Sequence, residues 1–215
     1  MCSQYWPIEL NKPTEYGPIE VTLLTEETLA EFTIRTLKIR RLNSLVEKTK
    51  NVTISENGER TNGLSEEEEY RIVYQFHYHE WPIHSCPYPN SILQFRRRVR
   101  IYMNEISQER AMGPTIVHCS DGCGRTGAYL CIDANLELAD EDNMYDVFGY
   151  TKKMRQARKG MIESVDQYKF VYECLEEAHI SGKTWFPVSE LSQQMKYKSM
   201  KTPITRQNEY QREYQ

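Results

Sequence analysis

The first part of the chain alternates hydrophobic and polar residues in steps of two, which is the pattern of half-buried strands. Two segments rich in β-branched residues show it, Val21 to Leu24 and Phe32 to Leu42, and Tyr70 to Tyr78 predicts a returning strand. Residues Asn43 to Glu69 are polar, contain two Asn-Gly pairs and include the acidic run Glu66 to Glu69. They predict a long surface connection between two strands.

In the second part, hydrophobic residues recur at helical spacing instead. The first helical stripe consists of Ile92, Phe95, Val99 and Met103. Three later segments share the spacing, from about residues 126 to 138, 144 to 154 and 165 to 175. Strands and helices in this order predict an α/β fold with a twisted mixed central sheet flanked by helices.

Residues His118 to Gly127 read HCSDGCGRTG and carry the strongest chemical signal of the chain. The preceding residues, Pro114 to Val117, are apolar and β-branched and predict a short buried strand, and a helix follows from about Thr126. A strand, a glycine-rich turn and a helix in this order direct several backbone N–H groups at one point, which makes an anion site. Cys119 then lies in a positive field that favours its thiolate, and Arg125 offers a planar fork for two phosphate oxygens. The predicted phosphate cradle consists of Ser120, Asp121, Gly122, Cys123, Gly124 and Arg125.

Asp121 places a carboxylate inside this predicted cradle. Two unit charges about 4 Å apart repel by about 4 kcal/mol at an effective dielectric constant of ~20. The carboxylate would also disfavour the Cys119 thiolate by like-charge repulsion. The alternative is that Asp121 turns outward or caps local amides as an Asx turn.

With these motifs in place, the chain resembles the cysteine-dependent protein-tyrosine phosphatases from Gln4 to about Ala178. Ser181 onward resembles the linker that follows the first of two tandem domains in receptor-type members. Further segments resemble two consecutive strands, the start of the mobile acid loop and two closing helices of that family: Tyr16 to Val21, Thr33 to Leu37, Trp81-Pro82, Met154 to Arg158 and Asp166 to Phe170.

The resemblance implies a role for each of five residues. Cys119 would be the nucleophile that forms a cysteinyl-phosphate, and Arg125 would bind the phosphoryl oxygens. Thr126 would hydrogen-bond the sulfur when it leaves, and Gln167 would position the hydrolytic water. His118 would tune the thiol through local hydrogen bonds, or it is a satisfied buried histidine.

Three departures from the family pattern fall on its chemistry. Ile83 stands where the family has the aspartate that protonates the leaving tyrosine oxygen, and a positioned general acid is typically worth about 10²–10⁴-fold in rate. His84 or Glu80 would have to replace it. Asp121 stands where the family has a small apolar residue, and Glu163 stands in place of a glutamine that assists hydrolysis. This combination resembles the pseudophosphatase domains of receptor-type members.

Composition excludes some partners and sets the expected compartment. The chain has 215 residues and a net charge of −4, so nucleic acid and anionic membranes are not expected partners. No apolar run approaches ~18 residues, and the six cysteines form no disulfide framework, which indicates a cytoplasmic location with reduced thiols. The parent chain would be anchored in a membrane outside this segment. We expect no cofactor, and no metal, because Cys119 and Cys123 lack further clustered ligands.

These observations divide the chain into residues 1–180, a phosphatase domain lacking roughly the N-terminal third of its family, and residues 181–215, a linker toward a second domain. The predicted function is regulatory. The domain would bind a phosphotyrosine protein, or dock against another phosphatase domain, with hydrolysis lost or strongly reduced. Two alternatives remain: an active phosphatase, and a non-catalytic interaction or dimerisation module.

Overall fold

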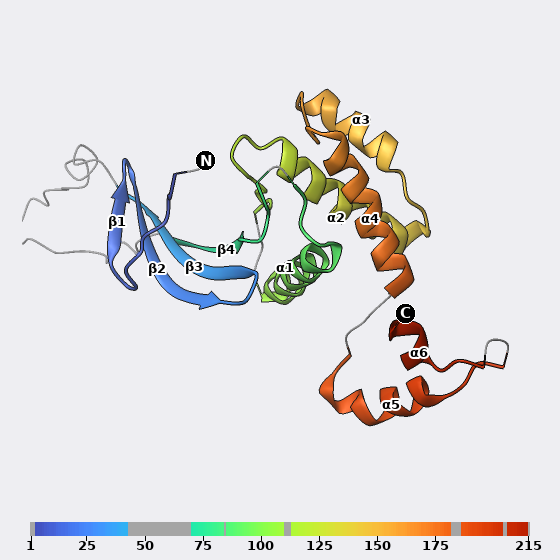
Figure 1. Ribbon diagram of the computed structural model, residues 1–215. Helices are drawn as coiled ribbons and strands as arrows, with labels where there is room; N and C mark the ends of the chain where they lie inside the picture. Colours follow the sequence, from blue (N-terminus) through green and yellow to red (C-terminus); the bar gives the residue numbers. More distant parts are fainter. Residues whose placement is uncertain are drawn as a thin grey trace, which may run out of the picture. The chain divides into compact units, whose positions relative to one another are not determined.

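The computed structural model describes residues 3–42, 70–83, 85–109, 113–181, 186–203 and 206–214 (Figure 1). The described residues belong to two compact units. The first comprises Met1–Ile83 with Arg98–Ile106, and the second comprises His84–Arg97 with Ser107–Gln215. The connection predicted over Asn43 to Glu69, and His84, lie outside the described residues.

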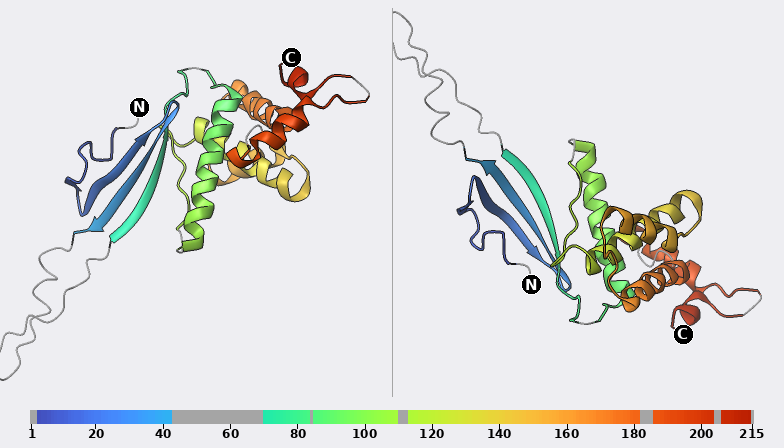
Figure 2. Two further views of the ribbon diagram at one scale, coloured as in Figure 1. Left: turned by 90° about the horizontal axis from the view of Figure 1, so that it is seen from below. Right: turned by 90° about the horizontal axis from the view of Figure 1, so that it is seen from above.

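The first unit is built on a four-stranded sheet in the order β1-β2-β3-β4, with every pairing antiparallel. The strands lie side by side in a curved sheet (Figure 2). Their bounds are β1 Pro13–Tyr16, β2 Ile19–Thr28, β3 Phe32–Arg41 and β4 Tyr70–Tyr78. The strands predicted from alternation are therefore confirmed, with β2 longer than its predicted core.

A tight turn at Gly17 and Pro18 joins β1 to β2. Gly17 has φ of +62°, and Tyr16 pairs with Ile19 across the turn. Glycine tolerates this φ at the first central position of a two-residue hairpin, where proline with its fixed negative φ can follow. The interpretation of Tyr16 to Val21 as one strand is therefore wrong, because the chain reverses direction within it.

One face of the sheet carries a small hydrophobic core. Leu23 pairs with Leu37 and Val21 pairs with Ile39 across β2 and β3, so these four side chains point to the same face. Trp6, from the N-terminal segment, packs against this cluster. The indole ring of Trp6 thus covers the hydrophobic side chains whose alternation predicted the strands.

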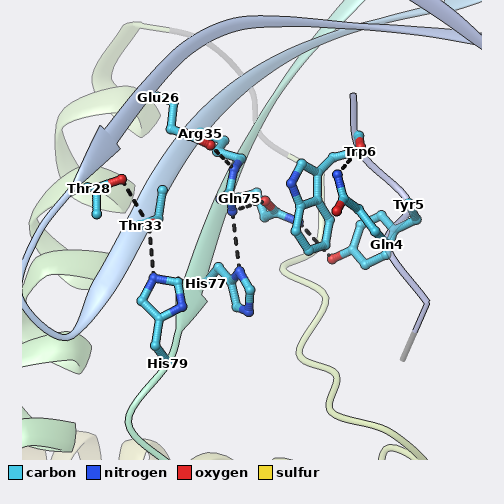
Figure 3. A network of polar contacts seen from close by, with 10 residues as sticks. All are labelled: Gln4, Tyr5, Trp6, Glu26, Thr28, Thr33, Arg35, Gln75, His77 and His79. Carbon is cyan, nitrogen blue, oxygen red and sulfur yellow. Dashed lines mark hydrogen bonds and ion pairs between the residues drawn. The ribbon is translucent and has the colours of Figure 1, made fainter. Parts of the chain in front are cut away.

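The same face holds a network of polar contacts centred on Arg35, which is only 8% exposed (Figure 3). Its Nε donates to Glu26 Oε2 at 2.5 Å and its Nη1 donates to Gln75 Oε1 at 3.1 Å. Its guanidinium carbon lies 4.8 Å from the centre of the Trp6 ring, and Gln75 Nε2 donates to the Tyr5 hydroxyl at 3.0 Å. A buried cation is tolerated only when it is paired and hydrogen-bonded, and these contacts supply both.

The opposite face of the sheet is covered by residues 98–106 of α1, which spans Pro89–Glu109. The Tyr102 ring packs edge-on against Tyr74 at 6.1 Å and Phe76 at 5.3 Å between ring centres. Arg98 lies 3.9 Å from a carboxylate oxygen of Glu27 on this side. The helical stripe predicted through Met103 is confirmed.

The second unit is helical, with its main packing between α2 and α4. Phe170, Val171 and Cys174 of α4 and Cys131 and Ile132 of α2 are almost completely buried. The helices are α2 Gly124–Asp142, α3 Val147–Ala157, α4 Val165–Ser181, the 3₁₀ turn η1 Val188–Glu190, α5 Leu191–Ser199 and α6 Glu209–Tyr214. The first part of α1 joins this unit through Arg96, whose Nε donates to Asp133 Oδ1 at 2.7 Å.

Two predicted elements differ from the structure. Helix α3 begins at Val147, three residues later than the pattern suggested, because the Asp146 carboxylate caps it by accepting from the Gly149 N–H at 2.8 Å. The strand predicted over Pro114 to Val117 does not form: the segment pairs with no described strand, and Ile116 is 84% exposed. A β-branched run becomes a strand only where another strand pairs with it. The α/β class is confirmed, while the parallel pairing that a mixed sheet requires is absent among the described strands.

None of the helices in the described parts of the chain combines the length and the apolarity needed to span a bilayer.

The close approach of α2 to the loop before α4 yields a prediction for stability. A Cβ at Gly127 would lie 2.5 Å from the backbone nitrogen of Ile162, which cannot move aside as a side chain can. We expect Gly127→Ala to lower the free energy of unfolding, because overpacking costs about 1–3 kcal/mol and exceeds the gain in helix propensity. Urea unfolding measures this. Gly113→Ala is the matched control, since its Cβ would meet nothing within 4 Å, and equal stability of both variants would contradict the prediction.

Candidate functional site

The glycine-rich loop bends immediately before α2, as the sequence predicts. Residues 120–123 form the bend, Gly122 adopts φ of +72°, and α2 begins at Gly124. The free N–H groups of a helix N-terminus therefore lie at the loop, where they favour an anion. Cys119, at the start of the loop, is half-buried.

Asp121 joins the two ends of this loop. Its Oδ1 accepts a hydrogen bond from the backbone N–H of Cys123 at 3.1 Å and from the thiol of Cys119 at 3.3 Å. The pKa of Asp121 lies below its ordinary value. The causes are the hydrogen bond from the Cys123 N–H, then the hydrogen bond from the Cys119 thiol, and the positive charge of Arg158 nearby. Both interpretations of this residue are thus present together: the carboxylate caps a local amide, and it also accepts a hydrogen bond from the Cys119 sulfur.

Opposing effects act on the pKa of Cys119. Partial burial raises the pKa, and the Asp121 carboxylate raises it further. The hydroxyl and backbone N–H of Thr126, with the backbone N–H of Gly122, more than offset both and leave the thiol pKa below its ordinary value. Neighbouring donors therefore favour the thiolate, and Asp121 opposes them.

The first turn of α2 contains Arg125 and Thr126. The Thr126 hydroxyl is buried and has no well-formed hydrogen bond within the described residues, although it lies near enough to Cys119 to favour the thiolate. Arg125 is half-buried and forms no salt bridge with any residue that the structure describes. At a helix N-terminus, a guanidinium with no ion-pair partner among the described residues can hold phosphate oxygens, and a hydroxyl near a thiolate can donate to the sulfur.

Glu163 and Gln167 reach the same loop from the N-terminal end of α4. A Cβ at Gly124 would lie 2.9 Å from Gln167 Nε2 and 3.0 Å from Glu163 Oε2, so both side chains contact this glycine. Gln167 Oε1 accepts from the backbone N–H of Glu163 at 2.9 Å, and Ser164 Oγ accepts from the Gln167 N–H at 3.1 Å. The Gln167 amide is therefore held at the loop, next to a second carboxylate.

Arg158 is a site residue that the sequence analysis missed. Its Nη2 donates to the Asp121 carbonyl oxygen at 2.6 Å, and its Nε donates to Cys123 Sγ at 3.4 Å. The Cys123 thiol also points at the carbonyl oxygen of Lys159 at 3.7 Å. Arg158 thus ties the loop to the segment after α3. In the sequence, Arg158 is marked only by its position in a basic stretch five residues before Glu163. A basic stretch does not indicate which residue it contacts.

The remaining predicted site residues lie in different surroundings. His118 is exposed, and its Nδ1 lies 3.1 Å from the carbonyl oxygen of Cys119, so the interpretation as a buried histidine is wrong. Ser120 is exposed at the bend. Ile83 belongs to the first unit and is 74% exposed. The structure therefore brings together the loop, Thr126, Glu163 and Gln167 within the second unit.

Comparison with known proteins identifies the family of the chain. Residues 1–177 match the family model of the protein-tyrosine phosphatases. The chain belongs to the protein-tyrosine phosphatase family. It is 33% identical over 184 residues to tyrosine-protein phosphatase 99A of Drosophila melanogaster and 38% identical over 192 residues to receptor-type tyrosine-protein phosphatase F of Danio rerio. It is 32% identical over 215 residues to receptor-type tyrosine-protein phosphatase U of Gallus gallus.

These three matches cover 85%, 88% and 100% of the chain, but they cover only 12%, 8% and 13% of the respective relatives. The chain thus spans about a tenth of the length of these relatives. The resemblance recognised from the HCSDGCGRTG motif is confirmed at the level of the family. The individual roles of its site residues remain proposals.

The opposing effects on Cys119 yield a prediction for thiol chemistry. In a Cys123→Ser background, Asp121→Asn should shift the pH midpoint of Cys119 alkylation by iodoacetamide downward, because the asparagine keeps an acceptor for the Cys123 position but removes the charge. Thr126→Val should shift the midpoint upward. Burial raises the pKa of Cys131 and Cys174, so these thiols should react slowly in all variants. An unchanged midpoint in Asp121→Asn would show that the carboxylate does not act on the sulfur.

Proposed function

We propose that the chain is the phosphatase domain of a receptor-type protein that has kept the nucleophile and the phosphate-binding arginine but hydrolyses phosphotyrosine poorly or not at all. Its role is then regulatory, through binding of phosphotyrosine in the Cys119 loop. The observation that supports this most directly is the pair of hydrogen bonds at Asp121, whose Oδ1 accepts from both the Cys119 thiol and the Cys123 N–H.

The charge of Asp121 weakens the site for its own ligand. A phosphate ester bound in the loop would accept hydrogen bonds from the backbone N–H groups of the loop. The Asp121 carboxylate competes for them, because it already accepts from the Cys123 N–H. Repulsion between two unit charges about 4 Å apart is about 4 kcal/mol at an effective dielectric constant of ~20, which corresponds to roughly a thousandfold in affinity. Rotation of the exposed Asp121 side chain away from the loop would relieve part of this cost. Weak binding therefore remains within reach of the loop.

Two further substitutions act on turnover. Isoleucine at position 83 has no proton to give, and a missing general acid removes about 10²–10⁴-fold in rate. Glu163 sets a carboxylate beside Gly124 where an amide would donate to the phosphate or to water. Loss of the acid slows the departure of tyrosine, and added negative charge disfavours the attack of a thiolate on an anion.

A slow phosphatase is the second candidate, and the pKa of Cys119 favours it. Hydrogen bonds from Thr126 and Gly122 keep this pKa below the ordinary thiol value despite burial and Asp121. A thiolate is the reactive form, so the first chemical step stays available to esters whose leaving group needs no proton.

The same proposal extends to partners and to organisation. The expected ligands are a phosphotyrosine protein or another phosphatase domain, since the relatives are named as receptor-type phosphatases. Residues 1–180 would form the phosphatase domain and residues 181–215 a linker toward another domain. The domain would act in the cytoplasm, with the membrane anchor of the parent protein outside this segment.

Hydrolysis of two substrates tests the proposal. We expect slow turnover of an aryl phosphate whose phenol is already acidic, and no measurable turnover of a phosphotyrosine peptide, because the thiolate is present and the acid is absent. Cys119→Ser is the control and should abolish the residual reaction. Turnover of both substrates at similar rates would overturn the pseudophosphatase interpretation.

Restoring the missing groups gives a second prediction. The double variant Ile83→Asp with Asp121→Ala should raise turnover of the phosphotyrosine peptide by at least about 100-fold, the lower limit for a positioned general acid. Asp121→Ala alone should mainly improve protection by vanadate against thermal unfolding. Asp142→Ala, which removes an exposed acid at the far end of α2, is the control. If the double variant stays inactive while Asp121→Ala gains vanadate binding, Ile83 is not the missing acid position.

A further inference from the structure

A histidine in the first unit faces a buried cation. His77 of β4 is half-buried and lies on the face of the sheet that carries the Arg35 network (Figure 3). Nη1 of Arg35, a residue that is only 8% exposed, lies 3.3 Å from His77 Nδ1. A guanidinium has N–H groups to donate and no acceptor. In this contact Arg35 is therefore the donor and His77 Nδ1 the acceptor, so the imidazole ring is neutral, with its proton on Nε2.

The charged groups around this pair do not compensate a second cation. Glu26 of β2 is the carboxylate of the network, and it is already paired with Arg35 at 2.5 Å. Gln75 of β4 contributes an uncharged amide, which accepts from Arg35 at 3.1 Å. The ring centre of His79 lies 4.6 Å from that of His77, and a protonated His79 would add to the positive charge. Protonation of His77 would thus set two cations against one carboxylate, an arrangement that disfavours the charged ring.

Trp6 rests on the same two side chains. Its ring centre lies 5.2 Å from that of His77 and 4.8 Å from the guanidinium carbon of Arg35. The neighbouring residue, Tyr5, accepts a hydrogen bond at its neutral hydroxyl from Gln75 Nε2 at 3.0 Å. Tyr5 and Trp6 therefore contact the sheet through side chains that converge on the Arg35 network (Figure 3).

We propose that protonation of His77 releases Tyr5 and Trp6 from the sheet, so that attachment of the N-terminal segment depends on pH. Protonation adds an N–H to Nδ1 and turns the hydrogen bond from Arg35 into a contact between two donors that are both positively charged. Arg35 is held by its carboxylate and amide partners, so the imidazolium is the group that turns toward solvent. The indole ring then loses one of its two supports. The backbone pairs with β2 at Leu10, which keeps the rest of the segment in place.

The direction of the pH dependence follows from the neutral ring. The attached segment requires neutral His77, whereas the released segment is compatible with either form of the ring. The attached state therefore binds fewer protons than the released state. It loses stability as the pH falls through the range in which histidine takes up a proton, from about pH 7 to pH 5.

Tryptophan emission of the intact chain tests the proposal. The chain has three tryptophans, so Trp81→Phe with Trp185→Phe leaves Trp6 as the reporter. Emission and quenching by acrylamide are followed as the pH is lowered, and far-UV circular dichroism of the same samples records the sheet.

Two variants in this background separate His77 from its neighbour. His77→Gln keeps an oxygen that can accept from Arg35 but cannot be protonated in this pH range. His79→Gln is the matched control, since it removes an exposed histidine two positions along the chain. Assigned ¹⁵N spectra of the histidine rings in the unsubstituted chain provide a measurement that needs no variant.

We expect acrylamide quenching of Trp6 to rise at least about twofold between about pH 7.5 and pH 5.5, because histidine changes its charge in this interval. The rise should be absent in His77→Gln, retained in His79→Gln, and matched by protonation of the His77 ring in the ¹⁵N spectra. Constant quenching while the His77 ring becomes protonated would overturn the proposal, because the imidazolium would then be tolerated beside Arg35 and the indole ring. A rise that persists in His77→Gln, or one accompanied by loss of the circular dichroism of the sheet, would also overturn it.

Discussion

One carboxylate joins the two ends of the Cys119 loop. Asp121 accepts hydrogen bonds from the backbone N–H of Cys123 and from the thiol of Cys119 through the same oxygen, so its carboxylate is held within the loop. Helix α2 begins directly after this loop, and Thr126 of its first turn helps to lower the pKa of the Cys119 thiol.

The loop owes its shape to contacts from outside its own segment. Arg158 holds the Asp121 carbonyl, Gln167 contacts Gly124, and the segment before α4 is fixed to α2 by the Ile162 N–H, which donates to the Cys123 carbonyl oxygen at 3.3 Å. Ile162 adopts φ of +59°, an uncommon conformation for a β-branched residue, and Arg155 binds its carbonyl oxygen. Strain of this kind persists only where the surroundings over-determine it, and it places Glu163 and Gln167 at the site.

Local signals in the sequence predicted much of this arrangement. The turn from Cys119 to Gly124 and the helix behind it follow from glycine, polar residues and helical spacing within about twenty positions, and the three long strands follow from alternation. The segment Pro114 to Val117 could not be placed in this way, because a strand needs a partner that periodicity does not supply. Arg158 was missed for a related reason: its contact with Asp121 spans 37 positions and no pattern encodes it. From the sequence, capping a local amide and facing the Cys119 sulfur are alternatives for Asp121. In the structure, its Oδ1 does both.

In the first unit, the packing of the sheet depends on residues near the start of the chain, Tyr5 and Trp6, which contact the Arg35 network. Trp6 shields the Val21, Leu23 and Leu37 cluster and at the same time stacks on the Arg35 guanidinium. Cleavage just after Trp6 would expose this hydrophobic cluster to solvent. It would also expose the Arg35–Glu26 ion pair to water. Proteolytic removal of the residues up to Trp6 would therefore leave a β-sheet with an exposed hydrophobic face, which is prone to self-association.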